Sequence, residues 1–201
     1  MKFNTKTNNR ESIRLKNYDY SQAGLYFITI CTQNYEYLFG DIQNDRMSLN
    51  DAGLMIDIQW NELLKRFNNI KLHEYVIMPN HFHGIIDISK SRAESYARPI
   101  FNDAHKKMDE HNVRPSNGTL EGSIGRIIQA FKSITTNQYI CGVKQNNWKR
   151  FDKKLWQRNY WDHIIRDENE FNRISQYIID NPKKWKNDKL NNGIGNVVME
   201  R

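Results

Sequence analysis

The sequence predicts an α+β fold in which helices pack on an antiparallel sheet. Apolar residues alternate with small polar ones over residues 25–33, and two further strand-like runs lie at 70–80 and 81–88. Apolar residues return at helical spacing in 54–67, 123–140 and 167–185. Hydrophobic residues make up 38% of the 201 residues and aromatic residues 12%, which is enough for a core and excludes a wholly disordered chain.

The first half of the chain supplies three strands and one helix. Residues 25–33 are rich in β-branched and aromatic side chains, and 37–50 has turn residues at its centre, as in a short hairpin. The helix expected over 54–67 would be capped by Asn50 or Asp51. Its apolar face is expected to contain Leu54, Ile58, Leu63 and Phe67. The runs at 70–80 and 81–88 form either a hairpin or one long bent strand.

The second half begins with a polar stretch at 89–122, which we interpret as a long mobile loop within one domain. Helical spacing then resumes over 123–140, where Ile124, Ile127, Ile128 and Phe131 share a face. Residues 155–166 predict a strand, and 167–185 a last helix with acidic residues in its first turn. That helix is expected to stop near Pro182.

The resulting order is strand, helix, strand, strand, helix, strand, helix. It fits a ferredoxin-like (RRM-like) core followed by one C-terminal helix. We expect a polar leader at 1–20, one domain at 21–186 and a tail at 187–201.

The charge of the chain is unevenly distributed. Residues 1–122 contain 15 basic and 15 acidic residues, whereas 123–201 contain 15 basic and 8 acidic ones, so the whole net charge of +7 lies in the last part. An anionic partner is therefore expected to meet that part. No apolar run is long enough to span a bilayer, the N-terminus lacks a signal peptide, and Cys31 and Cys141 show no zinc-ligand spacing. These features predict a cytoplasmic protein with reduced cysteines and no membrane partner.

Two small sets of residues are candidates for metal binding or catalysis. His81 and His83 are two apart in a predicted strand and would stand on one face, where two imidazoles can bind Mg, Mn or Zn. The alternative is a pair of hydrogen-bonded surface histidines. Tyr177 and Asn181 are four apart in the last predicted helix and would also share a face. A phenol there can act as a nucleophile toward phosphorus, although a core tyrosine and a helix-terminating asparagine are the simpler interpretation.

Four ordered segments together resemble the single-tyrosine HUH transposases, and most closely the branch that includes the REP-associated tyrosine transposases. They are YFITICTQ with LFG, YVIMPNHFHGII, GRIIQAFKS and LWQRNYWDHIIRDENEFNRISQYIIDNP. The resemblance extends from about Tyr26 to Trp185 and is interrupted by the polar loop.

This resemblance implies a metal-dependent nuclease that nicks and rejoins single-stranded DNA with hairpin ends. It implies that His81, His83 and Asn181 hold a divalent metal, Mg or Mn, and that Tyr177 is the nucleophile that forms a 5′-phosphotyrosine. Tyr139 is the second candidate nucleophile, but position 143 after it is a valine rather than a polar ligand. A homodimer and a monomer both remain open, as do a mobile element and a domesticated host function.

Other residues are weaker candidates. Basic side chains interleaved with aromatic ones are typical of single-strand binding, although a solvated basic face over an aromatic core explains them equally well. They are Arg126, Lys132, Lys149, Arg150, Lys153, Lys154 and Arg158. His163 is a possible accessory residue. The alternative functions are a non-catalytic RRM-like nucleic-acid-binding module and an HUH replication initiator or relaxase.

Overall fold

Four strands pair into one antiparallel sheet in the computed structural model, which describes residues 22–89 and 122–191. Their order across the sheet is β4-β5-β1-β6, so the first strand of the chain lies between two strands that come much later. A helical crossover joins β1 to β4 and another joins β5 to β6, which confirms the ferredoxin-like topology. The strands are β1 (Gly24–Cys31), β4 (Ile70–Ile77), β5 (His81–Ile88) and β6 (Trp161–Ile165).

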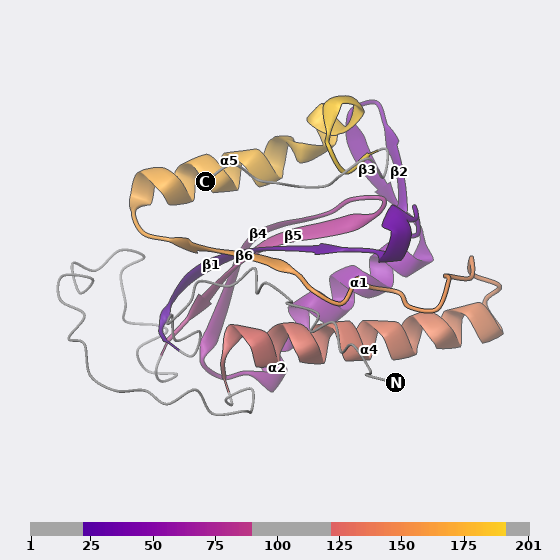
Figure 1. The fold of residues 1–201 in the computed structure, drawn as a ribbon, viewed down its shortest axis with the longest axis horizontal. Helices are drawn as coiled ribbons and strands as arrows, with labels where there is room; N and C mark the ends of the chain where they lie inside the picture. The colour runs from indigo at the N-terminus through magenta and orange to yellow at the C-terminus, as the bar shows by residue number, and fades with distance from the viewer. Residues whose placement is uncertain (1–21, 90–121, 192–201) are drawn as a thin grey trace, which may run out of the picture.

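Helices cover both faces of this sheet. Figure 1 shows α1, α2 and α4 on one side and α5 on the other. The larger core lies under α1 and α4, and a smaller core joins the opposite sheet face to α5. The helices are α1 (Asp51–Asn61), α2 (Leu63–Arg66), α4 (Ile124–Gln145) and α5 (Glu168–Lys184). No helix in the described ranges has the length and apolar character needed to cross a membrane.

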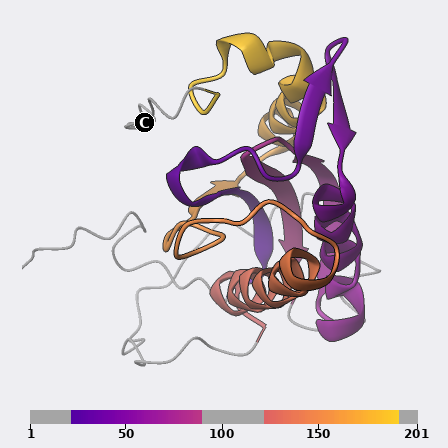
Figure 2. The same ribbon diagram turned by 90° about the vertical axis from the view of Figure 1, so that its right-hand side faces the viewer.

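A separate hairpin stands beside the sheet. Strands β2 (Gly40–Gln43) and β3 (Arg46–Leu49) are joined by Asn44 and Asp45, both with positive φ, as a tight two-residue turn requires. Figure 2 shows this hairpin reaching up beside the C-terminal end of α5. The expected hairpin at 37–50 is therefore present, and so is a second hairpin between β4 and β5.

Strand β5 is buried along its whole length because both sheet faces are covered. Phe82 points into the larger core, where its ring centroid lies 4.5 Å from that of Trp60 and 5.5 Å from that of Phe131. The residues on either side of Phe82 therefore point toward α5. The core on one face thus fixes the direction of both histidines on the other.

The apolar face predicted for residues 54–67 is right for Leu63, which is buried, and for Phe67, which packs against the core, but wrong for Leu54 and Ile58. Leu54 and Ile58 are 49% and 56% exposed, whereas Met55, Ile56 and Trp60 are buried. The helix is rotated so that Met55, Ile56 and Trp60 enter the core together, which buries two aliphatic side chains and a large aromatic one. The N-cap prediction is confirmed, since Asn50 Oδ1 accepts a hydrogen bond from Gly53 N–H at 2.9 Å.

One predicted boundary, that of the last strand, differs in the structure, whereas the predicted end of the last helix near Pro182 is confirmed. Only 161–165 of the predicted strand 155–166 forms a ladder, because the preceding residues pair with β1 only through the Thr32–Trp156 bridge. Helix α5 continues past Pro182 to Lys184, followed by the short helix η3 (Trp185–Asn187). A proline in the last turn removes only one intrahelical hydrogen bond.

The expected leader and polar loop lie outside the described residues, apart from the ends of that loop. Residues 187–191 of the expected tail pack on the domain, and Leu190 is buried there.

Candidate active site

His81 and His83 lie side by side on the face of β5 that α5 covers. Their ring centroids are 4.6 Å apart, and both side chains are fully buried. The alternation of a strand places them together, as the spacing predicts. They are therefore not surface histidines.

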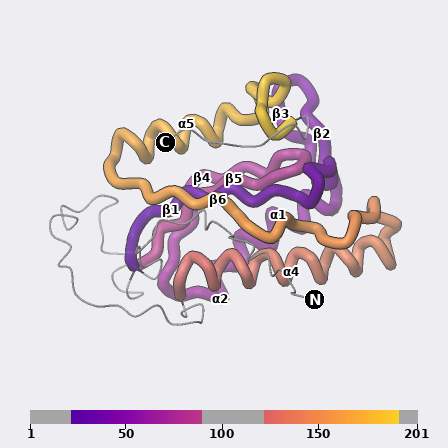
Figure 3. The backbone as a smooth tube through the Cα atoms, viewed as in Figure 1, coloured from indigo at the N-terminus to yellow at the C-terminus, as the bar shows by residue number. Residues whose placement is uncertain are grey.

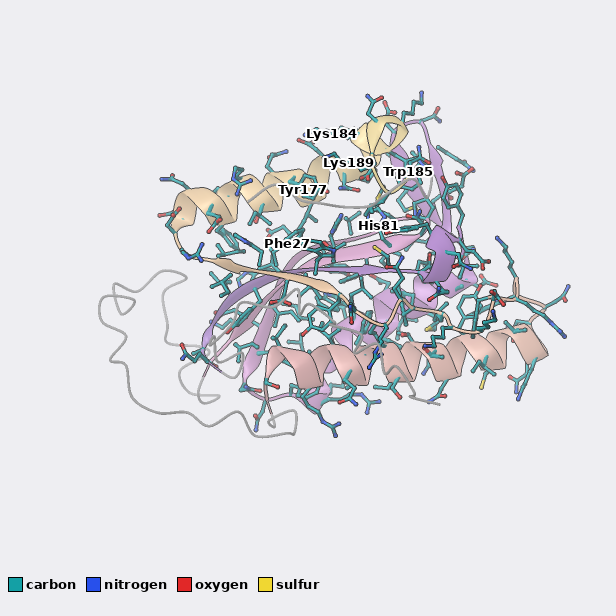
Figure 4. The ribbon with its side chains drawn as sticks, viewed as in Figure 1. Phe27, His81, Tyr177, Lys184, Trp185 and Lys189 are labelled. Atoms are coloured by element: carbon teal, nitrogen blue, oxygen red, sulfur yellow. The ribbon has the colours of Figure 1, made fainter. Side chains whose placement is uncertain are left out.

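Helix α5 brings Tyr177 and Asn181 over the same point. Asp167 caps the helix by accepting from Glu170 N–H, and Ile174 and Ile178 anchor it to the sheet. The Tyr177 hydroxyl lies 3.4 Å from His83 Nε2. Figure 4 shows Tyr177 and Trp185 on the helix side of this layer, and Phe27 and His81 on the sheet side. Two strand residues and two helix residues, 94 or more positions apart, thus form one cluster.

The hydrogen bonds around Asn80 determine which nitrogen of His81 carries its proton. Asn80 Nδ2 donates to the carbonyl oxygens of Leu190 at 2.7 Å and Tyr35 at 3.2 Å. This fixes the amide orientation, so Asn80 Oδ1, 2.8 Å from His81 Nδ1, must accept a proton from that nitrogen. In the neutral ring, His81 Nε2 then has a free lone pair.

Contacts on the sheet side also orient the ring of His83, as Asn80 orients that of His81. Its Nδ1 lies 2.7 Å from Thr29 Oγ1, a cross-strand neighbour in β1. The ring of Phe27 stacks on the imidazole with the centroids 5.3 Å apart. With Nδ1 engaged at the sheet, Nε2 points toward Tyr177.

Two polar atoms in the cluster are buried without a hydrogen bond of normal geometry in the described part of the chain. They are His81 Nε2 and Asn181 Oδ1. Burying a polar atom without a partner costs free energy, and a ligand bound between these two atoms would satisfy both. Both belong to the residues that the sequence resemblance assigns to a metal.

Burial keeps the cluster uncharged. It lowers the pKa of His81 well below the usual value, an effect that His83 strengthens and Asn181 opposes. Burial also lowers the pKa of His83 to about 3. The pKa of the Tyr177 phenol is raised to about 12, first by burial and then by the charge of Asp188, whereas the Asn181 amide lowers it. The cluster therefore holds neutral imidazoles, which can bind metal, beside a protonated phenol.

These donors fit a divalent metal. Imidazole nitrogens are ligands for divalent transition metals such as Zn²⁺, and an amide oxygen is a ligand that harder cations such as Mn²⁺ or Mg²⁺ accept. Within residues 22–89 and 122–191, no three His, Cys, Asp or Glu side chains gather as a metal site, so the third protein ligand would be the uncharged amide of Asn181.

A relative supports a family assignment. An uncharacterized protein of Haemophilus influenzae (strain Rd) is 40% identical to this chain over 189 residues, which are 94% of this chain and 97% of the relative. The chain belongs to the family of this H. influenzae protein. No protein-family model matches the chain.

Two solved structures are similar in arrangement. One is a REP-associated tyrosine transposase bound to a REP hairpin, with a TM-score of 0.47 and 16% identity, covering 81% of this chain and 68% of that one. The other is a proposed transposase from Deinococcus radiodurans R1, with a TM-score of 0.42 and 14% identity, covering 83% of this chain and 95% of that one.

Tyr139, the second candidate nucleophile, lies far from the histidines. It is buried in α4, on the opposite face of the sheet, and its hydroxyl donates to the carbonyl oxygen of Lys149 at 2.9 Å. His163 is on the α5 side but is bonded to Glu170, with His163 Nε2 2.7 Å from Glu170 Oε1. Among the hydrogen bonds within residues 22–89 and 122–191, none joins Tyr139 or His163 to His81, His83, Tyr177 or Asn181.

The predicted basic residues divide into two groups. Lys132, Lys153, Lys154 and Arg158 line one groove beside α4. The others lie elsewhere: Arg126 bonds Gln129, Lys149 is 3.8 Å from the carboxylate of Glu36, and Arg150 is exposed.

Sequence reasoning missed Asn80, Thr29, Phe27, Trp185 and Asp188. Asn80 immediately precedes His81, so its position was a usable signal. The others reach the cluster through long-range contacts: Phe27 and Thr29 through the pairing of β1 with β5, and Trp185, 6.0 Å between ring centroids from His81, through the turn after α5.

Proposed function

We propose that this protein is a metal-dependent, single-tyrosine HUH endonuclease that nicks single-stranded DNA and transfers strands. The observation that carries the proposal is the 3.4 Å approach of the Tyr177 hydroxyl to His83 Nε2, beside the unpaired His81 Nε2 and Asn181 Oδ1. Two imidazoles from β5 lie beside a phenol and an amide from α5, and these are the groups that the proposed chemistry needs. The ordered sequence motifs give the same assignment independently.

Each residue has a distinct role in this proposal. His81, His83 and Asn181 would hold Mg²⁺ or Mn²⁺, which supplies a Lewis acid for the phosphate and charge that favours the phenolate. Tyr177 Oη attacks the phosphorus, the bond from phosphorus to the 3′ oxygen breaks, and the 3′-hydroxyl leaves with a proton. The product is a 5′-phosphotyrosine.

The phosphotyrosine keeps the energy of the broken phosphodiester. A second 3′-hydroxyl can therefore attack it, release Tyr177 and rejoin DNA without a nucleotide cofactor. We expect the substrate to be single-stranded DNA beside a hairpin, as the sequence resemblance implies. Transposition and the processing of repeat hairpins both use this reaction.

The position of α5 does not favour a passive RRM-like module. In such a module, bases stack on the open face of the sheet. Here α5 covers that face, and Ile174 and Ile178 pack against Leu25, Ile85 and Ile165. The face carries two buried histidines rather than exposed aromatic platforms.

A cleavage assay tests the proposal. A labelled hairpin oligonucleotide with a single-stranded flank is incubated with the protein and Mg²⁺ or Mn²⁺, and a covalent adduct is detected on a denaturing gel. Tyr177→Phe is expected to abolish the adduct, whereas Tyr139→Phe, a matched loss of one buried hydroxyl, is expected to keep it. Unchanged cleavage in His81→Ala/His83→Ala would remove the metal site from the proposal.

A further inference from the structure

A basic groove lies on the far side of the sheet from the histidine cluster. It is enclosed by α4 and residues 153–160, has a volume of about 440 Å³, and is open to solvent. Figure 3 shows the chain running back along α4 after that helix ends, before it enters β6. Four of the lining side chains, Lys132, Lys153, Lys154 and Arg158, are cationic, and none is acidic. The groove is therefore suited to an anion.

Lys132 has a structural role in this groove, because its ammonium group is bonded to the backbone of residues 157–159. Its Nζ donates to the carbonyl oxygens of Gln157, Arg158 and Asn159, at 2.7, 3.2 and 3.2 Å. Burial lowers the pKa of Lys132 to about 8. Its charge thus offsets three carbonyl dipoles that would otherwise repel a phosphate.

The other three cationic side chains of the groove are free to contact a ligand. Lys153, Lys154 and Arg158 are exposed, and none of them forms an ion pair within the described ranges. Gln129 and Tyr160 add amide and aromatic surface to the same groove. Cations beside an aromatic ring are the combination that binds phosphates and stacks bases of single strands.

Backbone pairing links the wall of the groove to the strand that carries the cluster. Gln157 N–H donates to the carbonyl oxygen of Cys31 at 2.9 Å, and Cys31 pairs with His81. The groove wall is therefore two strand spacings, about 10 Å, from the metal-ligand candidate. Next to Cys31 the sheet edge is formed by the segment at Trp156 and Gln157, which separates the groove from the cluster.

We propose that this groove binds the single-stranded DNA segment next to the cleaved phosphodiester, with Lys153, Lys154 and Arg158 contacting its phosphates. This inference rests on the proposed function, because it takes DNA as the substrate. A groove of about 440 Å³ has the volume of a site for one small ligand, such as a nucleotide with its phosphate.

The test measures binding without chemistry. All proteins carry Tyr177→Phe, and the binding of a fluorescein-labelled single-stranded oligonucleotide is followed by anisotropy from 50 to 300 mM NaCl. Lys154→Ala/Arg158→Ala is expected to weaken binding about tenfold and to reduce the slope of log K against log salt by about 1.4, as two lost phosphate contacts require. The matched control is Lys65→Ala/Arg66→Ala, which removes one lysine and one arginine exposed on α2.

Two further variants separate loss of the groove contacts from a general loss of positive charge. The α2 double variant and the charge-conserving Lys154→Arg/Arg158→Lys are both expected to keep the wild-type slope. Equal losses in the two alanine doubles, an unchanged slope in Lys154→Ala/Arg158→Ala, or no binding by the Tyr177→Phe parent would overturn the groove proposal. The proposed nicking activity fails separately, if wild-type protein forms no covalent adduct while the groove variants still show reduced binding.

Discussion

Asn80 Oδ1 lies 2.8 Å from His81 Nδ1, and this contact fixes the tautomer of His81. The histidine is fully buried, so water does not compete for its ring nitrogens. The amide itself is fixed by two carbonyl oxygens, one of them from Leu190, 110 residues later in the chain. The turn after α5 thus helps to set which nitrogen of His81 carries the proton. A protonated Nε2 would be unable to bind a metal.

Replacing Asn80 by alanine is expected to release this tautomer. In the wild type, long-range ¹H–¹⁵N correlation spectra should show His81 protonated on Nδ1, whereas Asn80→Ala should show a mixture with protonated Nε2. The free energy of unfolding should also fall by about 1–3 kcal/mol, because the carbonyl oxygens of Tyr35 and Leu190 lose their donor.

Asn69→Ala is the matched control for that experiment. Asn69 Nδ2 also donates to two carbonyl oxygens, those of Ser89 and Gly122, but far from the cluster. It should cost stability without changing the His81 spectrum. Identical His81 spectra in Asn80→Ala and the wild type would contradict the positioning role of Asn80.

Gly84→Ala is expected to destabilise the protein by about 1–3 kcal/mol. A Cβ at this position would lie 2.8 Å from Trp60 Cζ2 and 2.9 Å from Phe82 Cε1, both in rings of the larger core. Urea unfolding measures the loss. Gly24→Ala, in β1, should be nearly neutral because its nearest contact would be 3.6 Å. Equal effects of the two substitutions would show that the packing under the histidines is looser than described.

Acidification should destabilise the metal-free protein. The folded state keeps His81 and His83 neutral because burial lowers the pKa of each, His83 to about 3, whereas the unfolded chain protonates them near pH 6.5. Between pH 6.5 and the lower pKa values of the folded state, the unfolded chain binds more protons than the folded protein does. The free energy of unfolding therefore falls as the pH falls. Each histidine contributes about 1.4 kcal/mol per pH unit below about pH 6.5.

Urea unfolding at pH 7.5, 6.0 and 5.0 measures this dependence. Stability that stays constant from pH 7.5 to 5.0 would be incompatible with two buried neutral histidines.

Asn181→Asp should tighten Mn²⁺ binding. The substitution replaces the buried, unpaired Oδ1 by a carboxylate oxygen of the same size, and an anionic oxygen is the better ligand for a hard cation. Electron paramagnetic resonance of free Mn²⁺ gives the affinity. Asn181→Leu, of similar volume, should abolish binding. Equal Mn²⁺ affinity in the wild type, Asn181→Asp and Asn181→Leu would exclude Asn181 as a ligand.

The parts of the site that sequence could predict depend on local periodicity. His81 and His83 share a face because strands alternate, and Tyr177 and Asn181 share a face because helices repeat every 3.6 residues. Both pairs follow from spacing within a few residues. That the two pairs meet at one point was implied only by the family resemblance, because it depends on how α5 crosses the sheet.

The remaining features depend on long-range packing. Thr29 and His83 are 54 residues apart, and Lys132 reaches three carbonyls 25 to 27 residues later. Spacing alone could not separate Lys132, which is held by these carbonyls, from its exposed neighbours in the groove. The same limit applies to α1, where Leu54 and Ile58 have the expected spacing but the helix buries Met55, Ile56 and Trp60 instead.

Identification of the residue that becomes bonded to DNA tests the central proposal most directly. The wild-type protein is incubated with Mn²⁺ and a hairpin oligonucleotide, digested with trypsin and nuclease, and mapped by mass spectrometry. The proposal predicts a nucleotide attached through its 5′-phosphate to Tyr177, and to no other tyrosine. A nucleotide on a different residue, or an adduct that persists in Tyr177→Phe, would contradict it.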